Sequence, residues 1–369
     1  DDMRIRDEKI ALDLGVLGQE TTGAAGFSFA MRSVPALRTY CELARKYASP
    51  NVKIFNFTNP AGVVSQTLRD LGYDFTYGIC DAPSSLLHAF AKLNHVSQDE
   101  VTGDCYGLNH LSFFSNVKLK GQDIMPRLLE EDEVYQKTDM RFFEKDLAKH
   151  LGCILNEYLY YFYYREMALE NILKAGITRG EVIRDVNRGM TEELSHMDIE
   201  HDFDNCLRVF EKWYGMRENA YMANETGIKT GKPPFSFDIY EKDSGGYAGV
   251  ALKYMYSELS GQESEMILCV PNQGAIPGLR DTDVVEITCT IRDGKYIPHK
   301  IDEPGELQME LIRRVKSYER YASQALRTNS RSKAVDCLML HPLVNSYSLA
   351  QKLVSQYIES NKNYTEEWT

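Results

Sequence analysis

The sequence of 369 residues lacks the features that mark several large classes of protein. Its net charge of −12 comes without a basic tract, which excludes nucleic acid as the main partner because nothing would neutralise a run of phosphates. No apolar run reaches the roughly 20 residues that a membrane-spanning helix needs, and no signal-peptide pattern opens the sequence. Eight cysteines are scattered without a C-x-x-C pair, so we expect free thiols in a cytoplasmic protein that has no membrane partner.

Common active-site motifs are missing as well. The sequence contains no Walker loop, no G-x-G-x-x-G turn, no nucleophile elbow and no Ser-His-Asp pattern. The apolar content of 43% is nevertheless ample for a core, and the length suggests two domains. We expect residues 1–120 to be the remainder of a Rossmann-like dinucleotide-binding domain. Residues 121–369 then form a mostly helical α+β domain.

Strands and helices alternate in the first third of the chain. Residues 51–59 predict a buried strand, and 60–72 a helix with Pro60 at its start and Gly72 at its end. Residues 75–79 predict a second strand, followed by a helix that Ser84 or Ser85 could cap. This order is typical of a doubly wound α/β sheet, in which ligands bind beyond the carboxyl ends of the strands. Asn59, Cys80 and Asp81 are expected at that edge.

The rest of the sequence is mostly of helical character. A helix is also expected from Ser33 to Tyr47, and residues 106–121 predict a loop that leads into an extended segment. The exception in the second half is residues 284–301, which predict a β-hairpin around Asp293-Gly294.

Two residues suggest a metal site, although each has a plainer interpretation. Cys80 ends an apolar strand, where a cysteine is most often a small core residue, and a lone loop histidine such as His110 is most often solvated. A thiolate and an imidazole together suit a divalent transition metal and leave positions open for substrate oxygens. Asp81 fits either a helix N-cap or a proton donor, and Tyr158 either aromatic packing or chemistry.

Seven segments, in this order, resemble glycoside hydrolase family 4. They are "MRIRDEKIALDLGVLGQETTGAAGFSFAMRSVP", "NFTNPAGVV", "GICDAP", "YGLNHLSFF", "NEYLYYFYY", "ITRGEV" and "PNQGAIPGLRDTDVVEI", and the resemblance runs from Met3 to about Asn361. The family comprises glycosidases that depend on NAD and Mn²⁺ and do not use a pair of carboxylates. The resemblance is closest to the 6-phospho-glucosidases, and it implies a fold like that of lactate and malate dehydrogenases.

The resemblance also implies a reaction. NAD⁺ oxidises C3 of the sugar, a base removes the acidified C2 proton, the C1 substituent leaves, water adds and NADH reduces C3 again. By motif, Cys80 and His110 resemble the metal ligands, Tyr158 the C2 base, and Asp81 the acid for the leaving group. The substrate is then a small phosphorylated sugar. Tyr247 is the alternative base, and no residue is assigned to NAD.

Four further residues carry over as substrate contacts. Arg4 resembles the arginine that grips the 6-phosphate, a role suited to a guanidinium. Glu20, Asn59 and Arg179 resemble contacts to the sugar and the metal site. The motif C-D-x-P around Asp81 is typical of phospho-α-glucosidases, whereas "YGLNHLSF" resembles the β members more closely. We therefore favour a 6-phospho-α-glucosidase, with a 6-phospho-β-glucosidase as the alternative.

One departure from the family concerns the glycine-rich NAD-binding segment of roughly 60–90 residues that opens family chains. It is not in the sequence, which either starts late or belongs to a truncated, non-catalytic relative. A plain dehydrogenase is a further alternative, but it would show a catalytic His-Asp pair in place of Cys80 and His110. Residues 158–164 hold more tyrosine than a small core needs, so we expect a homodimer or homotetramer.

Overall fold

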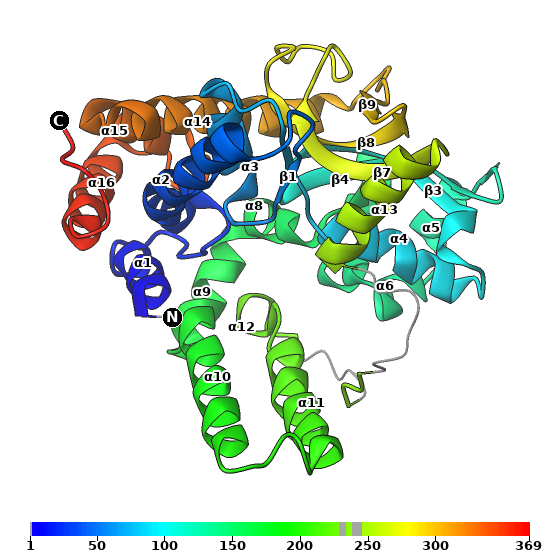
Figure 1. Ribbon diagram of the computed structural model, residues 1–369, viewed down its shortest axis with the longest axis horizontal. Helices are drawn as coiled ribbons and strands as arrows, with labels where there is room; N and C mark the ends of the chain where they lie inside the picture. The colour runs from blue at the N-terminus through cyan, green and yellow to red at the C-terminus, as the bar shows by residue number, and fades with distance from the viewer. Residues whose placement is uncertain (1, 229–233, 238–245) are drawn as a thin grey trace.

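The computed structural model describes residues 2–228, 234–237 and 246–369, and Figure 1 shows a helical body around two β-sheets. The larger sheet has the order β1-β2-β7-β8-β9. Only β1 and β2 are parallel to each other, and each later strand runs antiparallel to its neighbour. Its strands are β1 (Ile54–Asn56), β2 (Thr76–Gly78), β7 (Ser264–Pro271), β8 (Val284–Arg292) and β9 (Lys295–Pro298).

The predicted strand–helix alternation is present as β1–α3–β2–α4. The larger sheet takes strands from both sides of residue 120, because β7 pairs with β2. The division into domains at that residue stays a prediction. The predicted hairpin around Asp293-Gly294 is confirmed: it joins β8 to β9, and both turn residues have positive φ, as a tight two-residue turn requires.

The smaller sheet confirms the extended segment predicted within residues 106–121, as β4, but shows that the predicted loop before it is wrong. Instead of a loop leading into one extended segment, β3 and β4 form an antiparallel hairpin whose two turn residues are Asn109 and His110. Gly107 has φ +136°, and a side chain there would collide with the backbone of Leu111, so the glycine lets the two strands approach. The strands are β3 (Val101–Leu108), β4 (Leu111–Leu119), β5 (Gln122–Asp123) and β6 (Ile154–Leu155).

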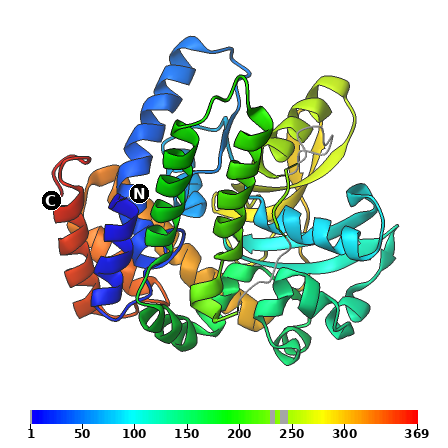
Figure 2. The same ribbon diagram turned by 90° about the horizontal axis from the view of Figure 1, so that it is seen from below.

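Helices cover both sheets and form most of the chain after residue 120 (Figures 1 and 2). The α-helices are α1 (Asp2–Asp13), α2 (Gly23–Tyr47), α3 (Ala61–Asp70), α4 (Ala82–Leu93), α5 (Met125–Glu130), α6 (Val134–Lys137), α7 (Lys145–Leu151), α8 (Tyr160–Tyr163), α9 (Arg165–Ala175), α10 (Arg179–Ser195), α11 (Phe203–Asn219), α12 (Ala223–Thr226), α13 (Gly246–Ser260), α14 (Glu306–Thr328), α15 (Arg331–Leu340) and α16 (Tyr347–Asn361). Short 3₁₀ turns are η1 (Gln98–Glu100), η2 (Asp139–Phe142) and η3 (Glu157–Leu159).

Two helix predictions need correction. Helix α2 begins at Gly23, ten residues before the predicted start, and its first turns are fully buried. Burial of "GAAGFSFA" against the body therefore outweighs the weak helix propensity of its glycines. Helix α4 begins at Ala82, so Ser84 and Ser85 lie inside it and do not cap it. Asp81 stands at the N-cap, but its side chain makes no capping hydrogen bond.

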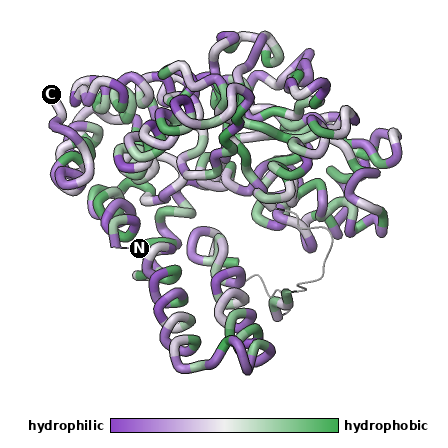
Figure 3. Tube along the Cα trace, viewed as in Figure 1, coloured by the Kyte–Doolittle hydropathy of each residue, from purple (hydrophilic) through white to green (hydrophobic). Residues whose placement is uncertain are grey.

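The apolar residues gather along the central strands and the helices that pack on them, whereas the outer helices are mostly polar (Figure 3). Helices α10 and α11 project from the body as an antiparallel pair (Figures 1 and 2). Gly189 makes this packing possible, because a side chain there would collide with the ring of Trp213. The Trp213 indole donates a hydrogen bond of 2.8 Å to Glu193, which ties the two helices together.

The aromatic segment 158–164 packs largely within the chain. Tyr160 and Tyr161 are buried, and the other four rings are partly buried against the core. Self-packing therefore accounts for much of this tyrosine content, and the homo-oligomer stays a prediction. All eight cysteines are buried and free, as predicted. Within the described ranges, no helix is both long and apolar enough to span a membrane.

Candidate functional site

Cys80 and His110 face each other at the carboxyl end of β2. Strand β2 ends at Gly78, and the chain stays against β1 because the Ile79 N–H donates to the Asn56 carbonyl at 2.9 Å. The β3–β4 turn brings His110 to the same place, with φ +60°. The Cys80 Sγ and His110 Nε2 atoms are 3.6 Å apart, and both residues are buried. Two residues 30 positions apart in sequence are thus in contact.

Tyr158 joins this pair from a different part of the chain. It lies in the short turn η3, where the Asn156 side chain accepts a hydrogen bond of 3.0 Å from the Tyr158 N–H. Its ring stacks on the His110 imidazole, with centroids 3.9 Å apart and planes 12° apart. Tyr221 donates its hydroxyl proton to Glu157 Oε1 at 3.1 Å, so in its hydrogen bond with Tyr158 it is the acceptor.

Burial sets the protonation of all three groups in the chain alone. It lowers the pKa of His110 to about 3, which keeps the imidazole neutral and able to bind a metal. Burial, Glu286 and Asp81 raise the pKa of the Cys80 thiol well above its ordinary value. Burial, Glu20 and Glu157 likewise raise the pKa of Tyr158. Tyr158 therefore needs a neighbouring positive charge before it can act as a base near neutral pH.

Asp81 lies on the rim of this cluster. It precedes α4 and forms a side-chain hydrogen bond with Tyr247, at the start of α13. The Tyr247 ring in turn stacks on Phe57, with centroids 4.7 Å apart. Burial raises the pKa of Tyr247, and Cys80 and Asp81 raise it further. The alternative base is thus placed beside the predicted acid, not beside His110.

Arg4 occupies a carboxylate-lined position on α1. Its guanidinium forms an ion pair with Glu20, and its Nε donates to Glu8 Oε1 at 3.0 Å. Glu8 also accepts a hydrogen bond of 2.9 Å from the Gly180 N–H at the start of α10. Burial raises the pKa of Glu20 to about 7, against the opposing effect of Arg4. The arginine is therefore held in place by two carboxylates before any anion arrives.

Arg179 and Asn59 are the remaining predicted contacts to the substrate. Arg179 stands at the first position of α10, and it interacts electrostatically with Arg4 and Glu20. Both Arg4 and Glu20 also interact electrostatically with Tyr158, which links the two parts of the site. Asn59 follows β1, at the same sheet edge as Cys80, and is joined to Pro60 by a cis peptide bond.

Three buried acids of this region escaped the sequence-based prediction. Glu157 precedes Tyr158 and stands inside a quoted motif, and Glu8 lies four residues after Arg4. Glu286 was detectable as the one charged residue in the strand run "VVEITC". Burial raises the pKa of Glu157 to about 8 and that of Glu286 to about 7. Acids so perturbed are enriched at functional sites.

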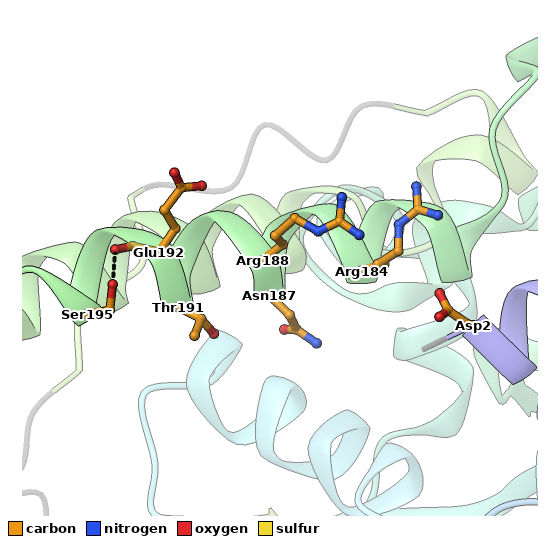
Figure 4. A pocket seen from close by; sticks show the side chains of 7 residues that line it. All are labelled: Asp2, Arg184, Asn187, Arg188, Thr191, Glu192 and Ser195. Carbon is orange, nitrogen blue, oxygen red and sulfur yellow. Dashed lines mark hydrogen bonds between the residues drawn. The ribbon is translucent and has the colours of Figure 1, made fainter.

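Surface hollows elsewhere do not coincide with the site. One of about 560 Å³ lies along α10, where Figure 4 shows Arg184 and Arg188 on one side and Asn187 and Thr191 on the other. Its one drawn hydrogen bond, from Ser195 to the Glu192 carbonyl at 2.7 Å, is internal to the helix. Another, of about 960 Å³, lies between α4, α13 and β7. Neither is lined by a predicted site residue.

The Cys80–His110 pair fits a single divalent transition metal. Bonds from such a metal to sulfur and nitrogen are about 2.3 and 2.1 Å long, so a 3.6 Å separation of the donors can bracket one ion. Within the described part of the chain, no group of three or more His, Cys, Asp and Glu side chains could hold an ion. Two protein ligands leave most of the coordination sphere to substrate oxygens, which suits a catalytic site and not a structural one.

Comparison with known proteins identifies the family. The model of family 4 glycosyl hydrolases matches residues 1–96, and the model of the C-terminal domain of the same family matches residues 105–344. The chain belongs to glycosyl hydrolase family 4. The resemblance noted in the sequence is therefore confirmed, and with it membership of a glycosidase family.

Named relatives within family 4 include enzymes for both anomers. The 6-phospho-beta-glucosidase BglT of Thermotoga maritima is 28% identical over 364 residues, which are 98% of this chain and 78% of that protein. The maltose-6'-phosphate glucosidase MalH of Clostridium acetobutylicum is 28% identical over 380 residues, with the same coverage of both chains. At this level of identity, family 4 membership does not choose between α and β substrates.

Solved structures of family 4 show the same fold. The Thermotoga maritima 6-phospho-beta glucosidase, solved with NAD and glucose-6-phosphate, has a TM-score of 0.78 and 26% identity over 99% of this chain and 79% of that one. A second crystal structure of that enzyme, with manganese, NAD⁺ and glucose-6-phosphate, has a TM-score of 0.71 over 99% and 78% of the two chains. The predicted Rossmann-like fold with a mostly helical remainder is confirmed.

Proposed function

We propose that the chain is a 6-phospho-α-glucosidase that hydrolyses phosphorylated disaccharides with the help of NAD and Mn²⁺. The observation that carries this proposal is the contact of Cys80, His110 and Tyr158, which come from three separate segments of the chain. The relatives support the substrate class and the cofactors, since the Thermotoga maritima enzyme was solved with manganese, NAD⁺ and glucose-6-phosphate.

The metal would be held by the Cys80 thiolate and His110 Nε2, the two atoms that face each other. When bound, Mn²⁺ supplies positive charge to sugar oxygens, and NAD accepts and later returns the hydride of C3. The neutral imidazole of His110 is ready for this role, because burial keeps its pKa low. The buried thiol has to lose its proton on metal binding, so binding should be weaker at acid pH.

Tyr158 is the proposed base at C2. Its stacking on His110 supports this role, because the base must lie close to a sugar that the metal ligands would hold. The proton passes from the C2–H bond to the Tyr158 oxygen, and the electron pair of that bond expels the C1 substituent. Tyr221 would stabilise the phenolate form by turning its hydroxyl proton from Glu157 to the Tyr158 oxygen. Tyr247 is the weaker candidate, since it is bonded to Asp81 instead.

Asp81 is the proposed acid, which donates its proton to the departing glycosidic oxygen. Its position directly after Cys80, at the start of α4, supports this role. Arg4 binds the 6-phosphate, with Glu8 and Glu20 orienting the guanidinium. Arg179, Glu20 and Asn59 contact the sugar hydroxyls. Glu20, with a pKa of about 7, would be neutral or charged according to pH.

The anomer is assigned from Asp81. An aspartate after the metal-binding cysteine resembles the α members of the family, and its carboxyl can protonate a leaving oxygen directly. The segment around His110 resembles the β members, so a 6-phospho-β-glucosidase is the second candidate. We also infer a cytoplasmic enzyme, because free buried thiols are typical of a reducing compartment. The homodimer or homotetramer is inferred separately, from the aromatic segment 158–164.

A single set of assays tests the function. Chromogenic α- and β-glucoside 6-phosphates are offered with NAD⁺ and Mn²⁺, and we expect at least tenfold higher kcat/KM for the α anomer. Faster cleavage of the β anomer would assign the second candidate. C80S should abolish metal-dependent turnover and leave the melting temperature within a few degrees, because a buried cysteine to serine change is small. Activity with neither anomer, or full activity of C80S, would reject the proposal.

A further inference from the structure

Glu286 is a buried carboxylate in a strand that is otherwise apolar. It is 1% exposed, and its neighbours on β8, Val285 and Ile287, are core residues. Among the residues that the structure describes, no lysine or arginine forms an ion pair with it. A buried charge without a cation is costly unless hydrogen bonds satisfy it. The identity of its hydrogen-bond donors therefore indicates what this residue stabilises.

Glu286 receives its hydrogen bonds from both sides of His110. The Asn109 side-chain amide donates to Glu286 Oε1 at 3.0 Å, and the Ser112 hydroxyl donates to Oε2 at 2.7 Å. A third donor, the Cys269 thiol, is 3.7 Å from Oε1. Asn109 and Ser112 flank His110 in the β3–β4 turn, whose backbone at His110 has the unfavourable φ of +60°. The Glu286 carboxylate therefore connects the residues on both sides of His110, and we name this set of hydrogen bonds among Glu286, Asn109, Ser112 and Cys269 the clamp.

The same clamp reaches Tyr158 through Ser112. The Asn156 N–H donates to the Ser112 carbonyl at 3.1 Å, and the Asn156 side-chain amide lies 3.4 Å from the Ser112 hydroxyl. The Asn156 side-chain oxygen then accepts the Tyr158 N–H at 3.0 Å. A continuous chain of hydrogen bonds therefore runs from Glu286 through Ser112 and Asn156 to the backbone of Tyr158.

We propose that Glu286 is a positioning residue that fixes the His110 imidazole and the Tyr158 ring against Cys80, and thereby sets the affinity of the site for a divalent transition metal. The inference rests on the proposed function, because it takes Cys80 and His110 as the metal ligands. Glu286 contacts neither ligand directly and acts through the residues beside His110. Outer groups of this kind commonly govern metal affinity by orienting the ligands.

A carboxylate is required because all three partners donate hydrogen bonds. In the E286Q variant, the amide oxygen can still accept from Asn109 and Cys269, but the amide nitrogen faces the Ser112 hydroxyl. Ser112 would then have to accept from two amides, and its own proton would lose its partner. E286Q therefore loosens the branch toward Asn156 and Tyr158, while N109A removes the branch toward His110.

The test compares E286Q and N109A with a matched control, D283N. Asp283 directly precedes β8, is 1% exposed and is paired with Arg320, so its substitution disturbs a buried acid that makes no hydrogen bond to Asn109, Ser112 or Cys269. Titration calorimetry with Mn²⁺ should show about 10- to 100-fold weaker binding for E286Q and N109A. D283N should bind Mn²⁺ as the wild type does.

Crystal structures of the metal-free proteins provide a second readout. We expect E286Q to lengthen the 3.9 Å separation of the His110 and Tyr158 rings, and D283N to leave it unchanged. Wild-type affinity together with an unchanged ring stack in E286Q would overturn the proposal, as would equal weakening in D283N. If C80S binds Mn²⁺ as tightly as the wild type, the proposed metal site is wrong, and the ring displacement alone then decides whether Glu286 positions these side chains.

Discussion

Two buried polar regions of this molecule follow opposite rules. In the first, which we name the α14 network (Gln66, Asp283, Lys316, Glu319 and Arg320), every charge has an opposite partner. Lys316, fully buried, pairs with Glu319 and donates to Gln66 Oε1 at 3.2 Å, and the Arg320 Nε donates to Asp283 at 2.7 Å. The network ties α14 to α3 and to the start of β8, and Gly62 leaves the room for Glu319.

The part of the candidate site around His110 buries acids and a histidine without such pairing, whereas Arg4 in the same site is paired with Glu8 and Glu20. Glu157 and Glu286 form no ion pair with the described lysines and arginines, and His110 Nδ1 has no hydrogen-bond partner there. The pKa values follow the contrast at Asp283 but not at Glu319. The Arg320 partner lowers the pKa of Asp283 despite its burial, whereas burial raises the pKa of Glu157 and Glu286. Burial also raises the pKa of Glu319, although Lys316 opposes the rise. Paired charges stabilise the fold, while unpaired ones leave the site dependent on a ligand.

The largest effect should come from the site itself. In Y158F, we expect exchange of the C2 proton with solvent deuterium to fall about 10²- to 10⁴-fold, because a general base typically contributes that much. Metal affinity should stay near that of the wild type, since Tyr158 is not a ligand. Mass spectrometry of the sugar measures the exchange. Exchange at the wild-type rate would move the base to another residue, and Y247F is the matched control.

The α14 network should respond in stability and not in chemistry. K316M leaves Glu319 buried without its cation, so we expect the free energy of unfolding to fall by about 3–5 kcal/mol. Chemical denaturation followed by circular dichroism measures the change. The folded fraction of K316M should still bind Mn²⁺ with wild-type affinity. A loss of metal affinity as large as that of E286Q would erase the distinction between the two regions.

Arg4 tests whether the paired guanidinium in the site serves a ligand. R4A should raise KM for a glucoside 6-phosphate about 10- to 100-fold, since a charged hydrogen bond contributes roughly 1.5–3 kcal/mol. Turnover of the unphosphorylated glucoside should change far less. R6A, an exposed arginine two residues away on α1, is the control. Equal effects of R4A on both substrates would exclude a role in phosphate recognition.

Glu157 gives the most specific effect, a pH dependence of stability. Burial raises its pKa from 4.5 to about 8, so the folded chain keeps a proton that the unfolded chain has already lost. Stability should therefore fall as the pH rises from about 4.5 to about 8. In E157Q, the drop in melting temperature between pH 5.5 and 8.5 should be smaller. E170Q, whose side chain is 71% exposed, should retain the wild-type drop.

The positions of several site residues could be predicted, because these residues lie in short motifs at the ends of predicted strands and turns. Cys80 and Asp81 follow a short apolar strand, and His110 lies between Asn109 and Leu111 in a turn, so their places at element ends could be read from the sequence. Their mutual contact was a matter of resemblance, since a spacing of 30 residues says nothing about distance. Glu157 and Glu286 were not predicted, because an acidic residue in a sequence carries no local sign that tertiary packing will bury it.

The sequence by itself determined the β1–α3–β2–α4 alternation that carries Cys80, the hairpin at Asp293-Gly294, the free state of the cysteines and the family. These follow from local propensity, composition and motif order, which need no knowledge of distant contacts. Only the tertiary structure decided that β7 joins β2, that residues 106–119 form a hairpin, and that Glu286 holds the turn of His110. Such pairings depend on which apolar surfaces are buried against each other when the chain folds. A contact between residues more than 170 positions apart, such as Asn109 and Glu286, cannot be predicted from the local sequence around either residue.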